Sequence, residues 1–387
     1  MKKATWLLLG CALAVCACRK DPVPATSQDA DLTGETTDVS GFPSDIRKIF
    51  VLNEGTMGSN NATLDFLRIP DGVYVTGAFK KMNPTVGAGL GDVGNDIATW
   101  NDEVWIVINQ SGIVEVLSAQ DETEIAAITL PTPRSIAFDD SYAYVTSWAG
   151  AYAAGSYDSD GHYTAADSSN PKGRVYRINL KTKKIEGSVE VGYQPEGIAC
   201  SNGRLYVANS GGISSQLPPD YSYDNTVSII DAAAFQVVRT VEVTVNLKQV
   251  FADADGHVYV TTQGNYQDIH SGIWQIDGTT VRKISDYVSV AAMTGDTVYC
   301  IGTENEFDWA APSRAYKGFR VHAGEKTGWD LSVEAQSLYG LAAVDADTFL
   351  IGDAGDYFNP GSVVCYNNGV RRWSVTAGVC PGHFAIW

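Results

Sequence analysis

Short apolar runs, separated by turns rich in Gly, Asn and Asp, recur along most of this chain. The clearest unit covers residues 191–243. Within it, an apolar segment at 195–200 is followed by an Asn202-Gly203 turn and by a second segment at 204–209. Asn-Gly favours a hairpin, because both central residues of a type I′ turn need a positive φ. Two more strand-like segments follow at 225–231 and 237–243, so the unit predicts four antiparallel strands.

Two apolar residues next to an aromatic residue mark the second strand of this unit, and the same signature recurs along the chain. Its seven copies are Ile49-Phe50-Val51, Val104-Trp105-Ile106, Ala143-Tyr144-Val145, Leu205-Tyr206-Val207, Val258-Tyr259-Val260, Val298-Tyr299-Cys300 and Phe349-Leu350-Ile351. Their spacing is close to the roughly 40–50 residues of a four-stranded propeller blade. The sequence therefore predicts an all-β fold, a seven-bladed β-propeller of four-stranded antiparallel blades.

The ends of the chain predict how the ring closes. The first copy has strand-like segments at 48–53, 62–69 and 73–79, but no first strand before them. Residues 381–387 resemble the first-strand segments of other copies. We expect this C-terminal strand to complete the first blade, which removes the open sheet edges of an unclosed array.

The N-terminus has the features of an export signal. Residues 1–17 contain two lysines and an apolar run that is too short to span a bilayer. Val15-Cys16-Ala17-Cys18 resembles the lipobox of bacterial lipoproteins, which implies cleavage before Cys18 and acylation of its sulfur; the alternative is a plain signal peptide. Residues 18–44 are poor in apolar side chains and predict a flexible tether. The propeller is expected over 45–387.

Net charge and cysteine content indicate which ligands and which state of the thiols to expect. A formal net charge of −18 argues against nucleic-acid binding, which needs a basic surface, and suits a soluble extracellular surface. Cys200 and Cys300 fall in predicted strands, as buried small apolar residues do. For Cys365 and Cys380, a disulfide bridge and two free thiols both stay open.

The long loops are the main candidate for function. In a propeller, the hairpins between second and third strands share one face with the connections between blades, and the long insertions of this chain belong to that set, joined by Tyr287 and Tyr339. Aromatic side chains there offer large rigid contact areas, and amides orient a ligand; the alternative is that the loops pack together and cap the channel. The candidate ligand-binding residues are Asn53, Glu54, Trp148, Tyr152, Tyr157, Tyr193, Asn209, Tyr221, Tyr223, Tyr266, Phe307, Trp309 and Tyr357.

Signatures of enzymes and cofactors are weak. Residues 89–94 satisfy GxGxxG, but they lie between predicted β-strands and not between a strand and a helix, so we interpret them as a loop between blades. Residues 158–161 and 253–256 begin like calcium loops but lack the final glutamate. Calcium binding stays an alternative for residues 158–161, whereas residues 253–256 are expected to form a hairpin turn. No cofactor or metal is predicted to be required. The acidic pairs Glu304 with Glu306 and Asp353 with Asp356 keep a propeller lyase or hydrolase open.

Several motifs together resemble one protein family. They are Leu52-Asn53-Glu54-Gly55, Gly58-Ser59-Asn60-Asn61-Ala62, Leu90-Gly91-Asp92-Val93-Gly94-Asn95-Asp96-Ile97, Val191-Gly192-Tyr193-Gln194-Pro195-Glu196, Leu205-Tyr206-Val207-Ala208-Asn209-Ser210-Gly211-Gly212, Trp373-Ser374-Val375-Thr376-Ala377-Gly378 and Pro381-Gly382-His383-Phe384-Ala385. These segments resemble the YncE-like seven-bladed propeller lipoproteins of gut Bacteroidetes, and most of all the BtuG group, which captures cobalamin and related cobamides.

The resemblance implies a function and a location. It implies a non-catalytic lipoprotein that binds a corrinoid and hands it to a TonB-dependent outer-membrane transporter. Lys20-Asp21, just after the acylated cysteine, resembles the signals that send such lipoproteins to the outer face of the outer membrane. A corrinoid is large, roughly planar at its ring and bordered by amides, which fits aromatic and amide-rich loops. Binding of another large ligand, such as a glycan or a peptide, is the main alternative.

Overall fold

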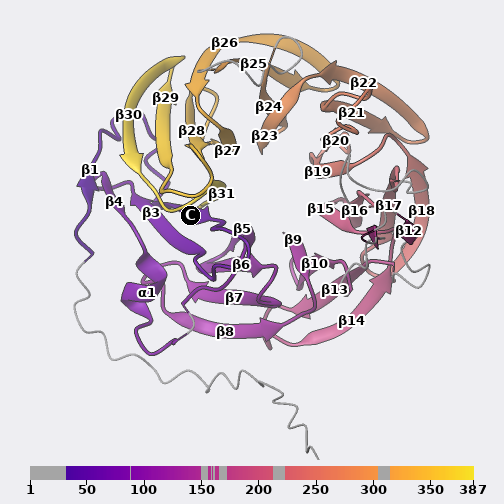
Figure 1. Ribbon diagram of the computed structural model, residues 1–387, viewed down its shortest axis with the longest axis horizontal. Helices are drawn as coiled ribbons and strands as arrows, with labels where there is room; N and C mark the ends of the chain where they lie inside the picture. Colours follow the sequence, from indigo (N-terminus) through magenta and orange to yellow (C-terminus); the bar gives the residue numbers. More distant parts are fainter. Residues whose placement is uncertain are drawn as a thin grey trace, which may run out of the picture.

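The computed structural model describes residues 32–87, 89–149, 156–157, 159, 162–164, 172–211, 223–303 and 314–387. In this part of the chain, six four-stranded antiparallel sheets and one five-stranded sheet are arranged in a ring (Figure 1). This arrangement confirms the predicted seven-bladed β-propeller. We number the blades one to seven along the chain, starting with the blade that contains residues 48–75.

Each blade has an inner, a second, a third and an outer strand. The inner strands, from blade one to blade seven, are β31 (Pro381–Ile386), β5 (Gly94–Trp100), β9 (Pro133–Phe138), β15 (Pro195–Ser201), β19 (Leu247–Ala252), β23 (Val288–Thr294) and β27 (Leu338–Ala343). The second strands are β2 (Lys48–Asn53), β6 (Glu103–Ile108), β10 (Tyr142–Ser147), β16 (Arg204–Asn209), β20 (Val258–Thr262), β24 (Thr297–Gly302) and β28 (Thr348–Asp353).

The outer half of each blade completes the sheet. The third strands are β3 (Thr63–Arg68), β7 (Ile113–Ser118), β13 (Arg174–Asn179), β17 (Thr226–Asp231), β21 (Gly272–Asp277), β25 (Arg314–His322) and β29 (Ser362–Asn367). The outer strands are β4 (Val73–Val75), β8 (Glu124–Thr129), β14 (Ile185–Glu190), β18 (Gln236–Glu242), β22 (Thr280–Asp286), β26 (Glu325–Ala335) and β30 (Val370–Thr376). A separate two-stranded sheet joins β11 (Ser156–Tyr157) and β12 (Tyr163–Thr164).

The second strands lie between neighbouring blades on both faces, which explains their continuous apolar sequence. Every residue of β2 is buried. Ile49 and Val51 pack in a cluster with blade seven, whereas Phe50 and Leu52 pack in a cluster with blade two. Successive side chains of a strand point to opposite faces, so a strand covered on both faces needs apolar residues throughout. The outer strand β8 instead alternates between more and less exposed residues.

The C-terminal strand closes the ring as predicted. β31 pairs antiparallel with β2, with Phe50 opposite Ala385 and Ile49 opposite Ile386. The first blade is therefore built from both ends of the propeller sequence. Residues 89–93 form the predicted loop between blades one and two, and Gly94 opens β5.

Blade one differs from the prediction at its outer strand. The sequence predicts a strand over 73–79, but β4 ends at Val75 and a short helix, α1 (Ala78–Met82), follows. Gly77 precedes the helix with a φ of 62°, a left-handed conformation that ends the strand and that glycine adopts without strain. The turn lets Phe79 pack into the apolar cluster between blades one and two.

Part of the segment that the sequence assigned to a tether is bound to the propeller. The strand β1 (Glu35–Thr36) pairs with β4 and widens blade one to five strands. The Trp373 indole N–H donates a hydrogen bond to the Asp38 carbonyl at 2.8 Å, and the Phe42 ring stacks on the same indole. Residues 32–44 therefore lie against blades one and seven.

The structure shows whether Cys365 and Cys380 form a disulfide bridge. Cys200, Cys300, Cys365 and Cys380 are all free thiols, so the alternative of a Cys365–Cys380 bridge is wrong. Cys300 and Cys365 are buried inside second and third strands. Over the same described ranges, the structure contains no helix that is long and apolar enough to cross a bilayer.

Candidate functional site

A repeated backbone hydrogen bond builds the loop face of the propeller. In six blades, the residue just before the inner strand has a positive φ: Val93, Thr132, Gln194, Asn246, Tyr287 and Cys380. In five of these blades, its carbonyl accepts the N–H of the residue that follows the second strand; those residues are Glu54, Asn109, Trp148, Ser210 and Gln263. In these five blades the bond ties the connection between blades to the exit of the second strand, so both sets of loops meet around the channel mouth, as the sequence predicts.

All seven blades contribute to a cavity of about 320 Å³ at this mouth. The second residue of every inner strand lines it: Gly382, Asn95, Arg134, Glu196, Lys248, Ser289 and Tyr339. Glu54, Gln263 and His383 also line it. The mouth of the channel is therefore a ring of mostly polar side chains that equivalent positions of the repeat supply.

Two hydrogen-bonded pairs fix part of this ring. The Arg134 guanidinium donates to one Glu196 carboxylate oxygen from Nε at 3.0 Å and from Nη2 at 2.8 Å. The same guanidinium lies 4.5 Å from the centre of the Trp148 ring, within cation–π distance. On the other side of the mouth, the Tyr339 hydroxyl donates to the Glu54 carboxylate.

Burial shifts the pKa values of three side chains at the channel mouth. It raises the pKa of Glu54, an effect that the hydrogen bond from Tyr339 and the nearby Arg134 and Lys248 charges oppose. It lowers the pKa of Lys248, since the interior disfavours the charged ammonium. Burial, together with the Lys248 and Arg134 charges, lowers the pKa of His383 to about 3, so this imidazole is neutral at physiological pH.

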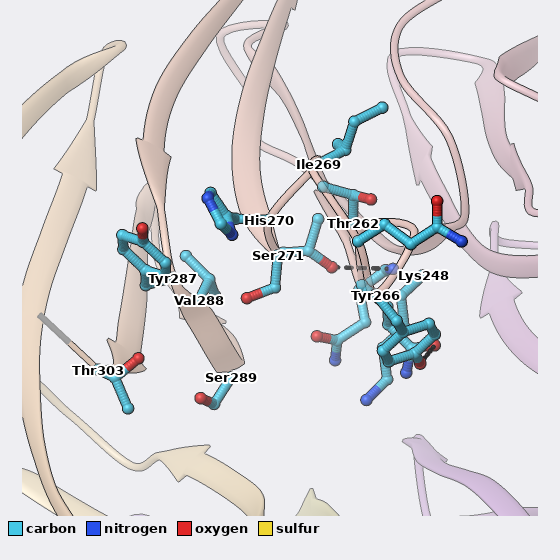
Figure 2. Close-up of a pocket in the computed structure, with 14 residues that line it drawn as sticks. Lys248, Thr262, Tyr266, Ile269, His270, Ser271, Tyr287, Val288, Ser289 and Thr303 are labelled. Atoms are coloured by element: carbon cyan, nitrogen blue, oxygen red, sulfur yellow. Dashed lines mark hydrogen bonds between the residues drawn. The ribbon is translucent and has the colours of Figure 1, made fainter. Parts of the chain in front are cut away.

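A larger cavity, of about 480 Å³, lies beside the mouth between blades five and six (Figure 2). The two cavities share Lys248, Gln249, Gln263 and Ser289. In Figure 2, Tyr266 and Lys248 stand on one side, and His270 and Tyr287 stand on the other. The His270 and Tyr287 rings are 4.8 Å apart at a tilt of 37°, and the Tyr266 hydroxyl donates to Gln263 Oε1 at 3.3 Å.

Several predicted ligand-binding residues lie on this face. Glu54 lines the mouth, Trp148 packs under Arg134, and Tyr266 lines the cavity between blades five and six. Tyr193 and Tyr357 are 43% and 45% exposed, and Tyr266 is 55% exposed. Burial raises the pKa of Tyr266, and the neighbouring Tyr223 hydroxyl adds to the shift. Of these three partly exposed rings, Tyr266 lines a cavity and Tyr357 contacts Tyr339, which lines the mouth.

Two of the predicted ligand-binding residues lie in the interior of their blades and not on the loop face. Asn53 and Asn209 are fully buried inside blades one and four. The Asn209 amide donates to Thr226 Oγ1 and Ser228 Oγ, at 3.0 and 2.9 Å, and its oxygen accepts the Gly192 N–H. The Asn53 amide donates to Thr63 Oγ1 at 3.0 Å. Both amides join neighbouring strands, so neither contributes to the surface of the mouth.

The remaining predicted residues lie outside the described part of the chain. They are Cys18, Tyr152, Tyr221, Phe307 and Trp309, together with the side chain of Tyr157. The calcium alternative at 158–161 also falls mostly outside it. At 253–256 the expected hairpin turn is present, and the Asp253 carboxylate accepts bonds from the backbone and the ring of His257. Within the described ranges, no group of three His, Cys, Asp or Glu side chains is arranged to hold a metal ion.

Sequence reasoning missed Arg134, Glu196, Lys248, Gln263 and His383. A usable signal exists, because Arg134, Glu196 and Lys248 are each the second residue of an otherwise largely apolar first-strand segment. When the seven repeats are aligned on this position, their second residues predict the set of polar side chains at the channel mouth.

Comparisons with known proteins identify the family. The family model described as "Domain of unknown function (DUF5074)" matches residues 48–348. The chain belongs to this family. The match spans most of the DUF5074 propeller, from β2 to the start of β28. A search among curated proteins gives no significant match.

A solved structure supports the fold. Kuenenia stuttgartiensis hydrazine synthase is similar to this DUF5074 protein with a TM-score of 0.54 and 15% sequence identity, over 75% of this chain and 88% of that chain. At this identity, the likeness concerns the propeller fold alone.

Proposed function

We propose that this DUF5074 propeller is a non-catalytic lipoprotein on the cell surface, which captures cobamides on its loop face and delivers them to a TonB-dependent outer-membrane transporter. The observation that carries the proposal is the composition of that face. Two adjoining cavities open there. Tyr266 and Tyr287 line the larger one, and Tyr339, which the partly exposed Tyr357 ring contacts, lines the mouth. Exposed aromatic groups gathered around a hollow are typical of ligand-binding surfaces.

The polar groups of the mouth suit the chemistry of a corrinoid. The corrin ring is flat and carries amide groups at its edge, which need both donors and acceptors. Gln249, Gln263 and Ser289 stand at the border between the two cavities, where an amide edge would meet them. Together with the surrounding tyrosines, they offer flat contact area and hydrogen bonds on one surface.

The acidic pair on blade seven favours a binding role over catalysis. Asp353 accepts the N–H groups of Gln336, Ser337 and Gly355, and Asp356 accepts those of Phe358 and Asn359. Both carboxylates are thus engaged in shaping the loop that carries Tyr357. This use supports the proposal of a non-catalytic protein.

The location on the cell surface and the transporter partner rest on the N-terminal sequence and the family resemblance. Acylation of Cys18 would attach the propeller to the outer membrane through residues that follow the lipid. Cys18→Ala should release the protein from the membrane fraction, as immunoblots of fractionated cells would detect.

Calorimetric titration tests the ligand. The propeller without its signal peptide should bind cyanocobalamin with a Kd of micromolar or below, in a 1:1 complex that perturbs the corrin absorption spectrum. A panel of oligosaccharides and peptides serves as the comparison. Binding of a glycan or a peptide, with no heat or spectral change from the corrinoid, would contradict the assignment and favour the alternative ligand.

A further inference from the structure

The cavity between blades five and six has one feature that the general function does not use: a lysine whose ammonium makes no direct contact with a carboxylate among the described residues. Lys248 is the second residue of β19, and its side chain lines both cavities. Among the described residues, its ammonium makes no hydrogen bond or ion pair. Glu54 and Glu196 are near enough to influence it, but they are hydrogen-bonded to Tyr339 and Arg134.

We propose that this cavity binds the nucleotide part of a cobamide, with the Lys248 ammonium contacting the phosphodiester and the aromatic side chains contacting the base. The inference rests on the proposed function and deepens it. A cobamide carries a phosphodiester, a ribose and a planar base on an arm that extends from its corrin ring. An anionic oxygen beside Lys248 would give this partly buried ammonium a direct ion-pair contact, in addition to the more distant Glu54 and Glu196 charges.

The walls of the cavity suit a planar base. His270 and Tyr287 form one wall, and Tyr266 stands opposite them (Figure 2). Aromatic faces accept a flat heteroaromatic ring by stacking. The hydroxyl of Ser289, which is exposed at the border with the channel mouth, is available to a ribose or a phosphate oxygen.

The size of the cavity favours part of the ligand over the whole. At about 480 Å³ it lies in the roughly 300–1,000 Å³ range of pockets for drug-sized molecules. A corrin ring with all its side chains is too large for it, whereas a base with its ribose phosphate fits. Because the cavity adjoins the mouth, one ligand can cover the mouth with its ring and place its nucleotide arm beside it.

The aromatic walls are held in place by the backbone. Tyr266 and Tyr287 have φ values of 60° and 63°, a left-handed conformation that is unfavourable for bulky residues. In the loop of Tyr266, the Asn265 side chain accepts the N–H groups of residues 267, 268 and 269 at 3.0, 3.1 and 2.9 Å. Such a fixed arrangement lowers the ordering cost of binding.

Two ligands and matched variants test the inference. Calorimetry would compare cyanocobalamin with dicyanocobinamide, which has the corrin ring but no nucleotide arm. Lys248→Met should weaken cyanocobalamin binding by about 10- to 100-fold and leave cobinamide binding within about two-fold. Tyr266→Ala, at a position that is 55% exposed, should show the same selectivity. Lys184→Met, at an exposed lysine of blade three, is the control and should change neither affinity.

The outcomes separate this inference from the proposed function. Equal losses for both ligands, or no loss of cyanocobalamin affinity in a Lys248→Met protein with an unchanged Tm, would overturn the nucleotide assignment and leave corrinoid capture intact. If Lys248→Met does not fold, the Tyr266→Ala comparison decides in the same way. A wild-type protein that binds neither corrinoid would overturn both proposals.

Discussion

The Arg134–Glu196 pair links the inner strands of blades three and four at the channel mouth. Its side chains are only 16% and 14% exposed, so removal of one partner leaves the other poorly solvated. We expect Arg134→Met to lower the free energy of unfolding by about 2–3 kcal/mol in urea denaturation. Arg68→Met is the matched control, because the Arg68–Asp71 pair is 34% and 47% exposed and should cost less than about 1 kcal/mol. Equal losses in the two variants would refute a special role for the pair at the mouth.

His383 predicts a pH dependence of stability. Its folded pKa of about 3 lies below the ordinary 6.5, so the unfolded chain binds this proton first as the pH falls. Stability from this residue is therefore complete above pH 6.5 and is lost as the pH drops toward 3, by up to about 1.4 kcal/mol per pH unit. In urea titrations between pH 7 and 4, His383→Gln should reduce the slope of unfolding free energy against pH. An unchanged slope would show that the imidazole does not titrate as described.

At single positions, sequence reasoning separated loop from strand but not surface from interior. Asn53 and Asn209 end second strands, next to the loops, and were expected to face a ligand. Each instead turns inward to a third-strand hydroxyl. Arg134 and Lys248 lie in apolar segments, yet the second position of the inner strand points at the channel mouth. The face to which a side chain at a strand end points depends on how that strand is paired with its neighbours, and the pairing register is not encoded in the local sequence pattern.

Among the secondary-structure elements, β31 has the largest effect on closure. Ala385 is 5% exposed and packs in the cluster shared by blades one and two. We expect Ala385→Glu to destabilise the propeller by about 3 kcal/mol or more, because it buries an unpaired charge and weakens the pairing with β2.

Thermal unfolding followed by circular dichroism, with size-exclusion chromatography for aggregation, would measure this effect. Val370→Glu is the control, since Val370 is 54% exposed on the outer strand β30. A Tm for Ala385→Glu as high as that of the control would contradict closure through β31.

Whole blades were predictable because each repeats a local pattern of strands and turns. The exceptions lie where contacts between distant segments decide the structure. The helix α1 replaces the end of a predicted strand because Phe79 reaches the core between two blades. The strand β1 forms in a polar segment because the edge of β4 is free to pair with it. Neither contact leaves a periodic signal in its own segment.

On the scale of the whole molecule, one face of the propeller gathers nearly all of the candidate chemistry. The cavity between blades five and six lies to one side of the channel mouth, and the exposed ring of Tyr357 on blade seven lies to another. The Tyr357 and Tyr339 rings form a T-shaped contact with centroids 5.8 Å apart, and Tyr339 in turn lines the mouth. A corrin ring that covers the mouth would therefore contact both Tyr357 and the residues near Lys248.

Tyr357 and Lys248 should consequently have different effects on the two corrinoids. In the proposed complex Tyr357 would contact the corrin ring, which cyanocobalamin and dicyanocobinamide share, so Tyr357→Ala should weaken both by a similar factor of about ten. Val238→Ala, at a residue 54% exposed on the outer strand β18, should weaken neither. The measurement is the same calorimetric comparison at constant pH and salt. Selective loss of only one corrinoid in Tyr357→Ala would mean that the ring does not extend from blade five to blade seven, and the ligand would then be confined to one side of the mouth.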